Sequence, residues 1–275
     1  MKYSFTFEEF IADIPFVNIH ISMPHPIPYY LTFGSVVLYC FLIFVIFPMF
    51  TPKSEEGRKR LEKNAKVHFA LLFVYSGIAF SATLYHIIQA GEIYDFQAYF
   101  CNPVPAWLRF LSLTFIVSKM WEWGDTAIDI WRGKTVSKIG FLHCYHHATT
   151  FFLFLLVQNF PGTEKAGMLL NGFVHTLMYY HYAFRLPRAF RPFITAAQIV
   201  QLITVTYLWH VTPATCTQNA TFPKDHYLEF LFPYLFVPVY CIFFVKFFVE
   251  SYLFPQRKGE GKSGKTSSDG HKKVK

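Results

Sequence analysis

Long apolar runs alternate with short polar connections along most of the chain. A helix rises 1.5 Å per residue, so crossing a hydrocarbon layer of roughly 30 Å takes about 20 apolar residues. Runs near this length predict about seven transmembrane helices, at Tyr30–Phe50, Val67–Ala90, Trp107–Ile130, Ile139–Phe160, Met168–Phe184, Phe193–Val211 and Tyr227–Phe254. The pattern therefore predicts an all-α, polytopic membrane protein with one membrane domain at residues 29–254, between an N-terminal segment, 1–28, and a tail, 255–275.

Composition supports a single membrane-embedded domain. Of the 275 residues, 53% are hydrophobic and 15% are charged, which is too apolar for a typical soluble domain. Residues 1–28 lack the basic start and short apolar core of a cleavable signal peptide. We expect the first apolar run itself to direct insertion.

The positions of the basic residues predict the orientation. They concentrate between predicted spans one and two, three and four, and five and six, and in the tail. An odd number of spans puts these segments on one side, which the positive-inside rule makes cytoplasmic, with residues 1–28 on the other side. The tail is expected to be disordered. It ends in Lys272-Lys273-Val274-Lys275, which is similar to a dilysine retrieval signal of endoplasmic reticulum membrane proteins, although a generic basic tail near anionic lipid is the alternative.

Two features of the predicted non-cytoplasmic loops suit a secretory-pathway membrane. Cys101 and Cys216 fall in these loops, where disulfides are permitted, and we predict a bridge between them, with two free thiols as the alternative. Asn219 begins an Asn-Ala-Thr sequon in the same region and is a candidate glycosylation site.

A histidine cluster lies in the fourth apolar run, FLHCYHHATT. His143, His146 and His147 are spaced i, i+3 and i+4, which puts their imidazoles on one helix face. Ionisable side chains are costly in lipid, so we expect them to face an interior cavity. Histidines in this pattern can bind iron or zinc, or one can act as a nucleophile while its neighbours transfer protons.

Three further polar clusters lie in neighbouring spans. They are Lys119, Glu122 and Asp125 in the third span, Asn171, His175, Tyr179 and His181 in the fifth, and Thr195, Gln198 and Gln201 in the sixth. All lie within roughly two or three helical turns of the predicted cytoplasmic face, so they can meet the histidines in one cavity. A rim suited to phosphate groups is expected there, made of Lys134, Lys138, Arg185, Arg188 and Arg191. The alternatives are a structural ion network, interhelical hydrogen bonds and a topology signal.

Four motifs in order carry a family resemblance. They are Lys119-x-x-Glu122-x-x-Asp125-Thr126, His143-x-x-His146-His147, Asn171-x-x-x-His175-x-x-Met178-Tyr179 and Thr195-x-x-Gln198-x-x-Gln201. This series resembles the ELO family of very-long-chain fatty acid elongases, which are 3-ketoacyl-CoA synthases of the endoplasmic reticulum. Membrane di-iron desaturases and hydroxylases share HxxHH but carry three histidine boxes, of which this chain has one. A seven-span transporter or receptor with an intramembrane relay is the non-enzymatic alternative.

The resemblance implies condensation of an acyl-CoA with malonyl-CoA, without a cofactor or metal. His146 is the expected nucleophile, with His143 and His147 as the alternatives, and the remaining histidines, His175 among them, would orient it or transfer protons. The other expected substrate-binding residues are Lys119, Glu122, Asp125, Asn171, Tyr179, His181, Gln198, Gln201, Arg185 and Arg188. Spans two to seven would enclose an apolar tunnel for the acyl chain.

One residue departs from the family pattern. His181 stands where the family usually has tyrosine, as either a pocket-lining substitute or a catalytic addition. Lys138 stands where members that use polyunsaturated substrates tend to carry glutamine. Lys138 therefore favours saturated or monounsaturated substrates. The other expected partners are membrane lipid and the ketoacyl-CoA reductase, dehydratase and enoyl reductase of the elongation cycle, with no nucleic acid. The sequence leaves open whether the protein forms a homo-oligomer.

Overall fold

The computed structural model describes residues 26–157, 161–215 and 227–254, and every regular element in this part of the chain is a helix. The prediction of an all-α fold is confirmed for these residues. Residues 1–25 and 255–275 lie outside them, as do Cys216 and Asn219. The glycosylation site therefore stays a prediction. Cys101 is disulfide-bonded, Cys40, Cys144 and Cys241 are free thiols, and the pairing of Cys101 with Cys216 stays a prediction.

The first predicted span is helical from α3 (Pro26–Phe41) through a π-helical stretch, η1 (Leu42–Ile46), to α4 (Phe47–Met49). Pro48 removes a backbone donor and crowds the preceding turn, which accounts for the wider π-helical turns just before it. The next helix, α5, runs over Glu55–Gln89. The Ser54 side chain caps its start by accepting a hydrogen bond from the backbone N–H of Gly57 at 3.0 Å.

The predicted third span is divided into two helices. A short α6 (Phe96–Cys101) precedes α7 (Ala106–Trp121) and α8 (Trp123–Trp131), and α9 (Val136–Ile139) follows. The break falls at Glu122, where the backbone N–H of Asp125 bonds to the Glu122 carbonyl at 3.0 Å, three residues back. This tighter turn changes the direction of side chains on either side of Glu122.

The second half of the chain contains α10 (Phe141–Val157), α11 (Pro161–Phe184), a 3₁₀ turn η2 (Arg188–Phe190), α12 (Arg191–Thr215), α13 (Tyr227–Phe248) and a π-helical end η4 (Val249–Leu253). α11 begins earlier than the predicted start at Met168. Lys165, expected in a loop, is therefore inside the helix, and its side chain is fully buried. The hydropathy pattern missed this start because Glu164 and Lys165 interrupt the apolar run.

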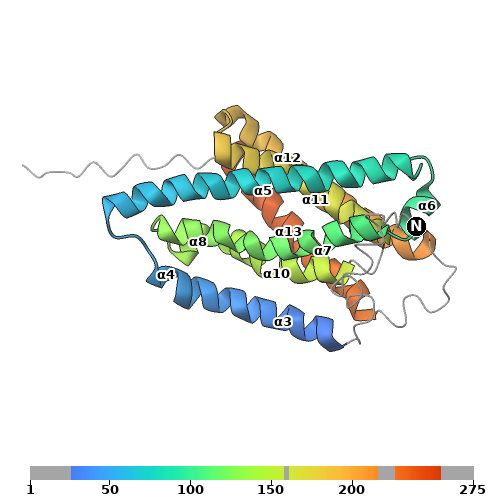
Figure 1. The fold of residues 1–275 in the computed structure, drawn as a ribbon, viewed down its shortest axis with the longest axis horizontal. Coiled ribbons are helices and arrows are strands. Elements are labelled where there is room, and N and C mark those ends of the chain that lie inside the picture. The colour runs from blue at the N-terminus through green and yellow to red at the C-terminus, as the bar shows by residue number, and fades with distance from the viewer. Residues whose placement is uncertain (1–25, 158–160, 216–226, 255–275) are drawn as a thin grey trace, which may run out of the picture.

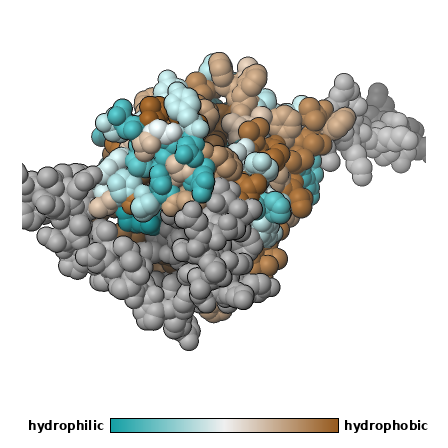
Figure 2. All heavy atoms as spheres, turned by 90° about the vertical axis from the view of Figure 1, so that its right-hand side faces the viewer, coloured by the Kyte–Doolittle hydropathy of each residue, from teal (hydrophilic) through white to brown (hydrophobic). Residues whose placement is uncertain are grey.

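The helices run roughly along one axis, with α3 and α5 on opposite sides and α7, α8 and α10 between them in the view of Figure 1. Within residues 26–157, 161–215 and 227–254, three stretches are long and apolar enough to cross a membrane, Glu55–Gln89, Arg188–Val211 and Leu231–Leu253, and Phe33–Met49 is a shorter apolar helix. The number of about seven spans stays a prediction. Figure 2 looks onto the end that carries α6 and shows hydrophilic residues gathered there and hydrophobic ones along the flank.

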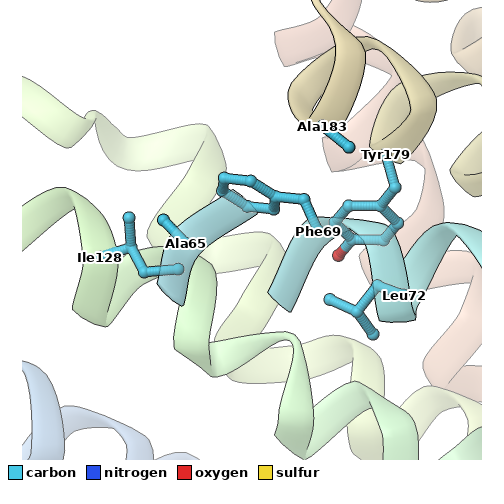
Figure 3. Close-up of a cluster of buried hydrophobic side chains, with 6 residues drawn as sticks. All are labelled: Ala65, Phe69, Leu72, Ile128, Tyr179 and Ala183. Atoms are coloured by element: carbon cyan, nitrogen blue, oxygen red, sulfur yellow. The ribbon is translucent and has the colours of Figure 1, made fainter. Parts of the chain in front are cut away.

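Packing between α5 and α11 fixes the position of the candidate site. At Gly172 on α11 an added Cβ would lie 3.1 Å from the backbone nitrogen of Phe80, so glycine permits a close approach of the two helices. Nearby, Phe69 and Leu72 of α5 pack with Tyr179 of α11 and Ile128 of α8, as Figure 3 shows. Burial of these apolar groups holds α5, α8 and α11 in one register.

Candidate active site

Three side-chain pairs join the α7–α8 segment to α11. Their members are spaced three residues apart on the α7–α8 segment and four residues apart on α11. Either spacing keeps side chains on one side of a helix, so the two sets can face each other. The pairs are Lys119 Nζ donating to Asn171 Oδ1 at 2.7 Å, Glu122 Oε1 beside His175 Nδ1 at 3.3 Å, and the Tyr179 hydroxyl donating to Asp125 Oδ2 at 2.8 Å. We call these pairs the ladder.

The centre of the ladder is a buried ion pair. Lys119 Nζ donates to Glu122 Oε1 at 2.6 Å, and the side chains are 1% and 2% exposed. The same carboxylate oxygen lies beside His175, so Glu122 links the lysine to the imidazole. A buried charge of this kind needs its partner, since removal of one leaves the other uncompensated.

Asp125 has a second partner that the sequence did not reveal. His68 Nε2 on α5 lies 2.7 Å from Asp125 Oδ1. The neighbouring Gly124 makes room for the imidazole, because an added Cβ there would lie 2.7 Å from His68 Cε1. His68 stands alone in the sequence, with no second histidine nearby to signal a motif. Only the fold brings it to Asp125.

The three HxxHH histidines lie on α10 but have different neighbours. His143 Nε2 is 3.0 Å from Thr126 Oγ1 on α8, and its ring centroid is 4.4 Å from that of His147. His146 instead faces α11 and α13, with its ring centroid 6.5 Å from that of His175 and 5.3 Å from that of Tyr240. His146 is therefore the member of the motif that is directed toward the ladder.

Several buried imidazole nitrogens retain capacity for a ligand or a proton. Among the described residues, Nδ1 of His147, His175 and His181 has no hydrogen-bond partner. His175 Nδ1 lies 3.3 Å from Glu122 Oε1, and this contact is an ion pair only when the ring is protonated. Within the same part of the chain, no group of three or more His, Cys, Asp or Glu side chains is arranged to hold a metal ion.

A cavity of about 1990 Å³ connects the polar clusters. The residues of the four motifs that line it are Asp125, His143, His146, His147, Asn171, His175, Met178, Tyr179, Thr195, Gln198 and Gln201, and His181 lines it as well. The structure thus brings together the positions that the sequence placed in four separate helices. Lys119 and Glu122 do not line the cavity, and they support its wall through Asn171 and His175.

The rim of this cavity is mainly basic. The basic residues that line it are Lys63, Lys66, Arg132, Lys134, Arg185, Arg191 and Lys246. Three of them are paired, since Arg132 donates twice to Glu62 at 2.8 Å, Lys134 donates to Asp129 at 2.9 Å, and Lys246 Nζ lies 3.8 Å from Glu250 Oε1. The hydrogen bonds to Glu62 raise the pKa of Arg132. Arg185 and Arg191 form no ion pair with a carboxylate in the described part of the chain.

Two residues expected at this rim are not part of it. Lys138 lies on α9 and Arg188 on η2, and both are exposed, but neither lines the cavity. Spacing predicted the loops correctly but could not show which side chains turn inward. Arg185 does turn inward, at the end of α11, from a left-handed backbone conformation with φ 57°.

A second, apolar pocket of about 80 Å³ adjoins the large cavity. Its lining includes Leu153 and Phe154 of α10, Val205 and Trp209 of α12, and Val237 of α13. Four residues line both spaces, namely His146, Asn171, Gln201 and Leu202. His146 therefore stands where a polar, basic-rimmed chamber meets an apolar pocket.

The apolar helices and the histidine-lined cavity define a multi-pass helical membrane protein with an enzyme-like site. The chain belongs to the ELO (GNS1/SUR4) family, whose model matches residues 28–260. The family resemblance of the four motifs is thereby confirmed.

Curated relatives agree with this assignment. The chain is 32% identical over 227 residues to human very long chain fatty acid elongase 6, and the matched region covers 74% of this chain and 81% of the relative. It is 30% identical over 204 residues to putative fatty acid elongase 4 of Caenorhabditis elegans, covering 69% of this chain and 66% of the relative. Mouse very long chain fatty acid elongase 3 is 29% identical over 211 residues, covering 71% of each chain.

Proposed function

We propose that this protein is a fatty acid elongase that condenses an acyl-CoA with malonyl-CoA, giving a 3-ketoacyl-CoA two carbons longer, carbon dioxide and free CoA. The observation that carries the proposal is the position of His146 at the junction of the large polar cavity and the apolar pocket. An acyl-CoA has a polar, phosphate-bearing half and an apolar half, joined at the thioester. The junction is where that thioester would lie if each half occupied the space that suits it.

The first step is transfer of the acyl group to His146. The unprotonated imidazole nitrogen attacks the thioester carbonyl carbon, the carbon–sulfur bond breaks, and the imidazole proton passes to the CoA thiolate. This leaves an acyl-imidazole and free CoA. His175 is the nearest α11 imidazole, with a ring-centroid distance of 6.5 Å, and is placed to assist this proton transfer.

The second step forms the new carbon–carbon bond. Malonyl-CoA loses its carboxylate as carbon dioxide, and the electron pair left on carbon attacks the acyl carbonyl. The acyl–nitrogen bond then breaks, and His146 takes up one proton to return to its starting state. No external oxidant or reductant is needed in either step.

Asn171 is suited to stabilise the oxygen that gains negative charge. Its Oδ1 accepts a hydrogen bond from Lys119, so its amide NH₂ is the end left to donate. Asn171 lines both the cavity and the pocket, as the thioester site requires. Gln198, which lines the cavity, is the second candidate donor.

The remaining substrate contacts follow from charge and polarity. Arg185 and Arg191 at the rim are suited to the phosphates of CoA, and the apolar pocket is suited to the start of a tunnel for the acyl chain. We place the protein in the endoplasmic reticulum membrane with the rim and the C-terminus in the cytosol. The reductase, dehydratase and enoyl reductase of the cycle would then act on its product.

Membranes containing the protein, incubated with labelled malonyl-CoA and acyl-CoAs of graded length, test the proposal. We expect label in a 3-ketoacyl-CoA with the wild-type chain, and none with His146→Ala. His210→Ala serves as the matched control, because His210 is an exposed histidine on α12 outside both spaces. Full activity of His146→Ala would reject the nucleophilic role, and stoichiometric iron in the purified protein would favour a desaturase or hydroxylase.

A further inference from the structure

Tyr39 on α3 is a buried polar residue that the four motifs do not include. Its side chain is fully buried, with 0% exposure, and it packs with Ile43, Trp123 and Ala148. A phenylalanine would fill the same apolar space, so the hydroxyl is the feature that calls for an explanation. A buried hydroxyl is costly unless it is hydrogen-bonded.

The Tyr39 hydroxyl begins a hydrogen-bonded chain that ends at the HxxHH motif. It lies 3.0 Å from Thr126 Oγ1, and the same oxygen lies 3.0 Å from His143 Nε2. A threonine hydroxyl has one proton and two lone pairs, so it can donate only one of these two bonds, and a bond accepted from Tyr39 leaves its proton available for His143. A phenol is the more acidic of the two hydroxyls. We therefore take Tyr39 as donor to Thr126 and Thr126 as donor to His143.

This direction fixes the tautomer of His143. If Nε2 accepts a hydrogen bond, the ring proton of the neutral imidazole must be on Nδ1. Without the tyrosine, both lone pairs of Thr126 Oγ1 would be free, and Thr126 could equally accept a bond from an Nε2–H group. The bond from Tyr39 occupies one of these lone pairs and thus favours donation by Thr126 to His143, with the ring proton on Nδ1.

The Tyr39 ring also contacts the second outer histidine of the motif. It stacks on His147 with a centroid distance of 6.5 Å and an interplanar angle of 16°. Tyr39 itself lines neither the large cavity nor the apolar pocket.

We infer that Tyr39 is a positioning residue through which α3 completes the active site, by holding His143 in one tautomer and the His147 ring in one orientation. This inference rests on the proposed elongase function. Tyr39 touches no substrate, and it acts on the reaction only through Thr126, His143 and His147.

Tyr39→Phe tests the inference, because it removes the hydroxyl and keeps the ring. Tyr75→Phe is the matched control, since the Tyr75 hydroxyl bonds to Thr114 Oγ1 at 2.8 Å between α5 and α7, outside both spaces. We expect Tyr39→Phe to lower kcat about tenfold, the effect of one hydrogen bond, with KM for both substrates unchanged. Tyr75→Phe should change kcat by less than about twofold.

Substitutions at Thr126 test the route. Thr126→Ser keeps the hydroxyl and should retain most of the activity, whereas Thr126→Val should lower kcat as Tyr39→Phe does. If Tyr39 acts through Thr126, adding Tyr39→Phe to Thr126→Val should produce no further loss beyond about twofold. Thermal unfolding in detergent establishes that each variant is folded.

The possible results separate the two proposals. An inactive wild-type protein would overturn the elongase function itself. An active wild-type protein with unchanged kcat in Tyr39→Phe, or with equal losses in Tyr39→Phe and Tyr75→Phe, would overturn the role of Tyr39. If Tyr39→Phe does not fold, full activity of Thr126→Val would overturn it instead.

Discussion

In the part of the chain that the structure describes, the bundle buries two clusters of charged side chains, one beside the histidines and one near the end that carries α6. In the second, Lys165 Nζ donates to Glu92 Oε2 at 2.6 Å and Arg109 pairs with Glu164 at 2.8 Å. His86 Nε2 lies 3.8 Å from Glu92. We call these residues the α6-end cluster. Glu92, Glu164 and Lys165 are as deeply buried as Lys119 and Glu122, and Arg109 is 16% exposed.

The two clusters differ in what lies next to them. The ladder borders the large cavity through Asp125, Asn171, His175 and Tyr179, whereas no member of the α6-end cluster lines either that cavity or the apolar pocket. Buried charge in an apolar helix therefore does not by itself mark a reaction site in this protein. Access to a cavity is the feature that distinguishes the two.

Replacement of one lysine in each cluster should produce the largest difference in elongation activity between the two clusters. Lys119→Met and Lys165→Met each leave a buried carboxylate without its ammonium partner, and each should destabilise the protein by about 3–5 kcal/mol. Only Lys119→Met should also abolish elongation by the folded fraction. Thermal unfolding and activity per folded molecule measure the two effects separately, and equal specific activities would show that the clusters do not differ in function.

Asn171→Asp sharpens the comparison within the ladder. An aspartate can still accept from Lys119, but it has no NH₂ to donate to the thioester oxygen, so we expect kcat to fall about 100-fold. Asn64→Asp, at an exposed position on α5, should have wild-type kinetics. A variant Asn171→Asp with normal kcat would remove Asn171 from the proposed mechanism.

The apolar pocket predicts a smaller effect on acyl-chain preference. Val205 lines the pocket, and Ile203 on the same helix is exposed. Val205→Phe should fill part of the space and shift the preferred acyl-CoA toward shorter chains, by about tenfold in relative kcat/KM. Ile203→Phe should leave the preference as it is. An unchanged chain-length profile in Val205→Phe would place the acyl chain elsewhere.

Substitution of an arginine in the basic rim should have the smallest effect on the kinetics. Arg185→Asn removes the charge and introduces asparagine, a residue that tolerates the left-handed backbone at this position. We expect KM for malonyl-CoA to rise about threefold with kcat unchanged, and the difference to shrink at high salt. Arg188→Asn, off the cavity, is the control. Equal changes in both variants would count against a specific phosphate contact.

Sequence spacing predicted the components of the site better than their partners. The i, i+4 spacing of Asn171, His175 and Tyr179 correctly placed them on one face of α11. Lys119, Glu122 and Asp125 were expected to line the cavity together, but the break at Glu122 leaves only Asp125 at its surface. A local change of helix geometry of this kind has no signature in a hydropathy pattern.

Residues far apart in the chain were missed for a different reason. Tyr39 and His68 are isolated polar residues in apolar helices, and single residues of this kind are common where no site exists. Their partners, Thr126 and Asp125, become visible only when α3 and α5 are packed against α8. Tertiary packing, rather than periodicity, carries that information.

Mass spectrometry of the intact protein after incubation with acyl-CoA alone tests the central claim most directly. With no malonyl-CoA present, the first step should stop at the acyl-imidazole. We predict that the wild-type protein gains the mass of one acyl group, that malonyl-CoA removes it, and that His146→Ala gains none. Acylation of His146→Ala to the wild-type extent would contradict the account.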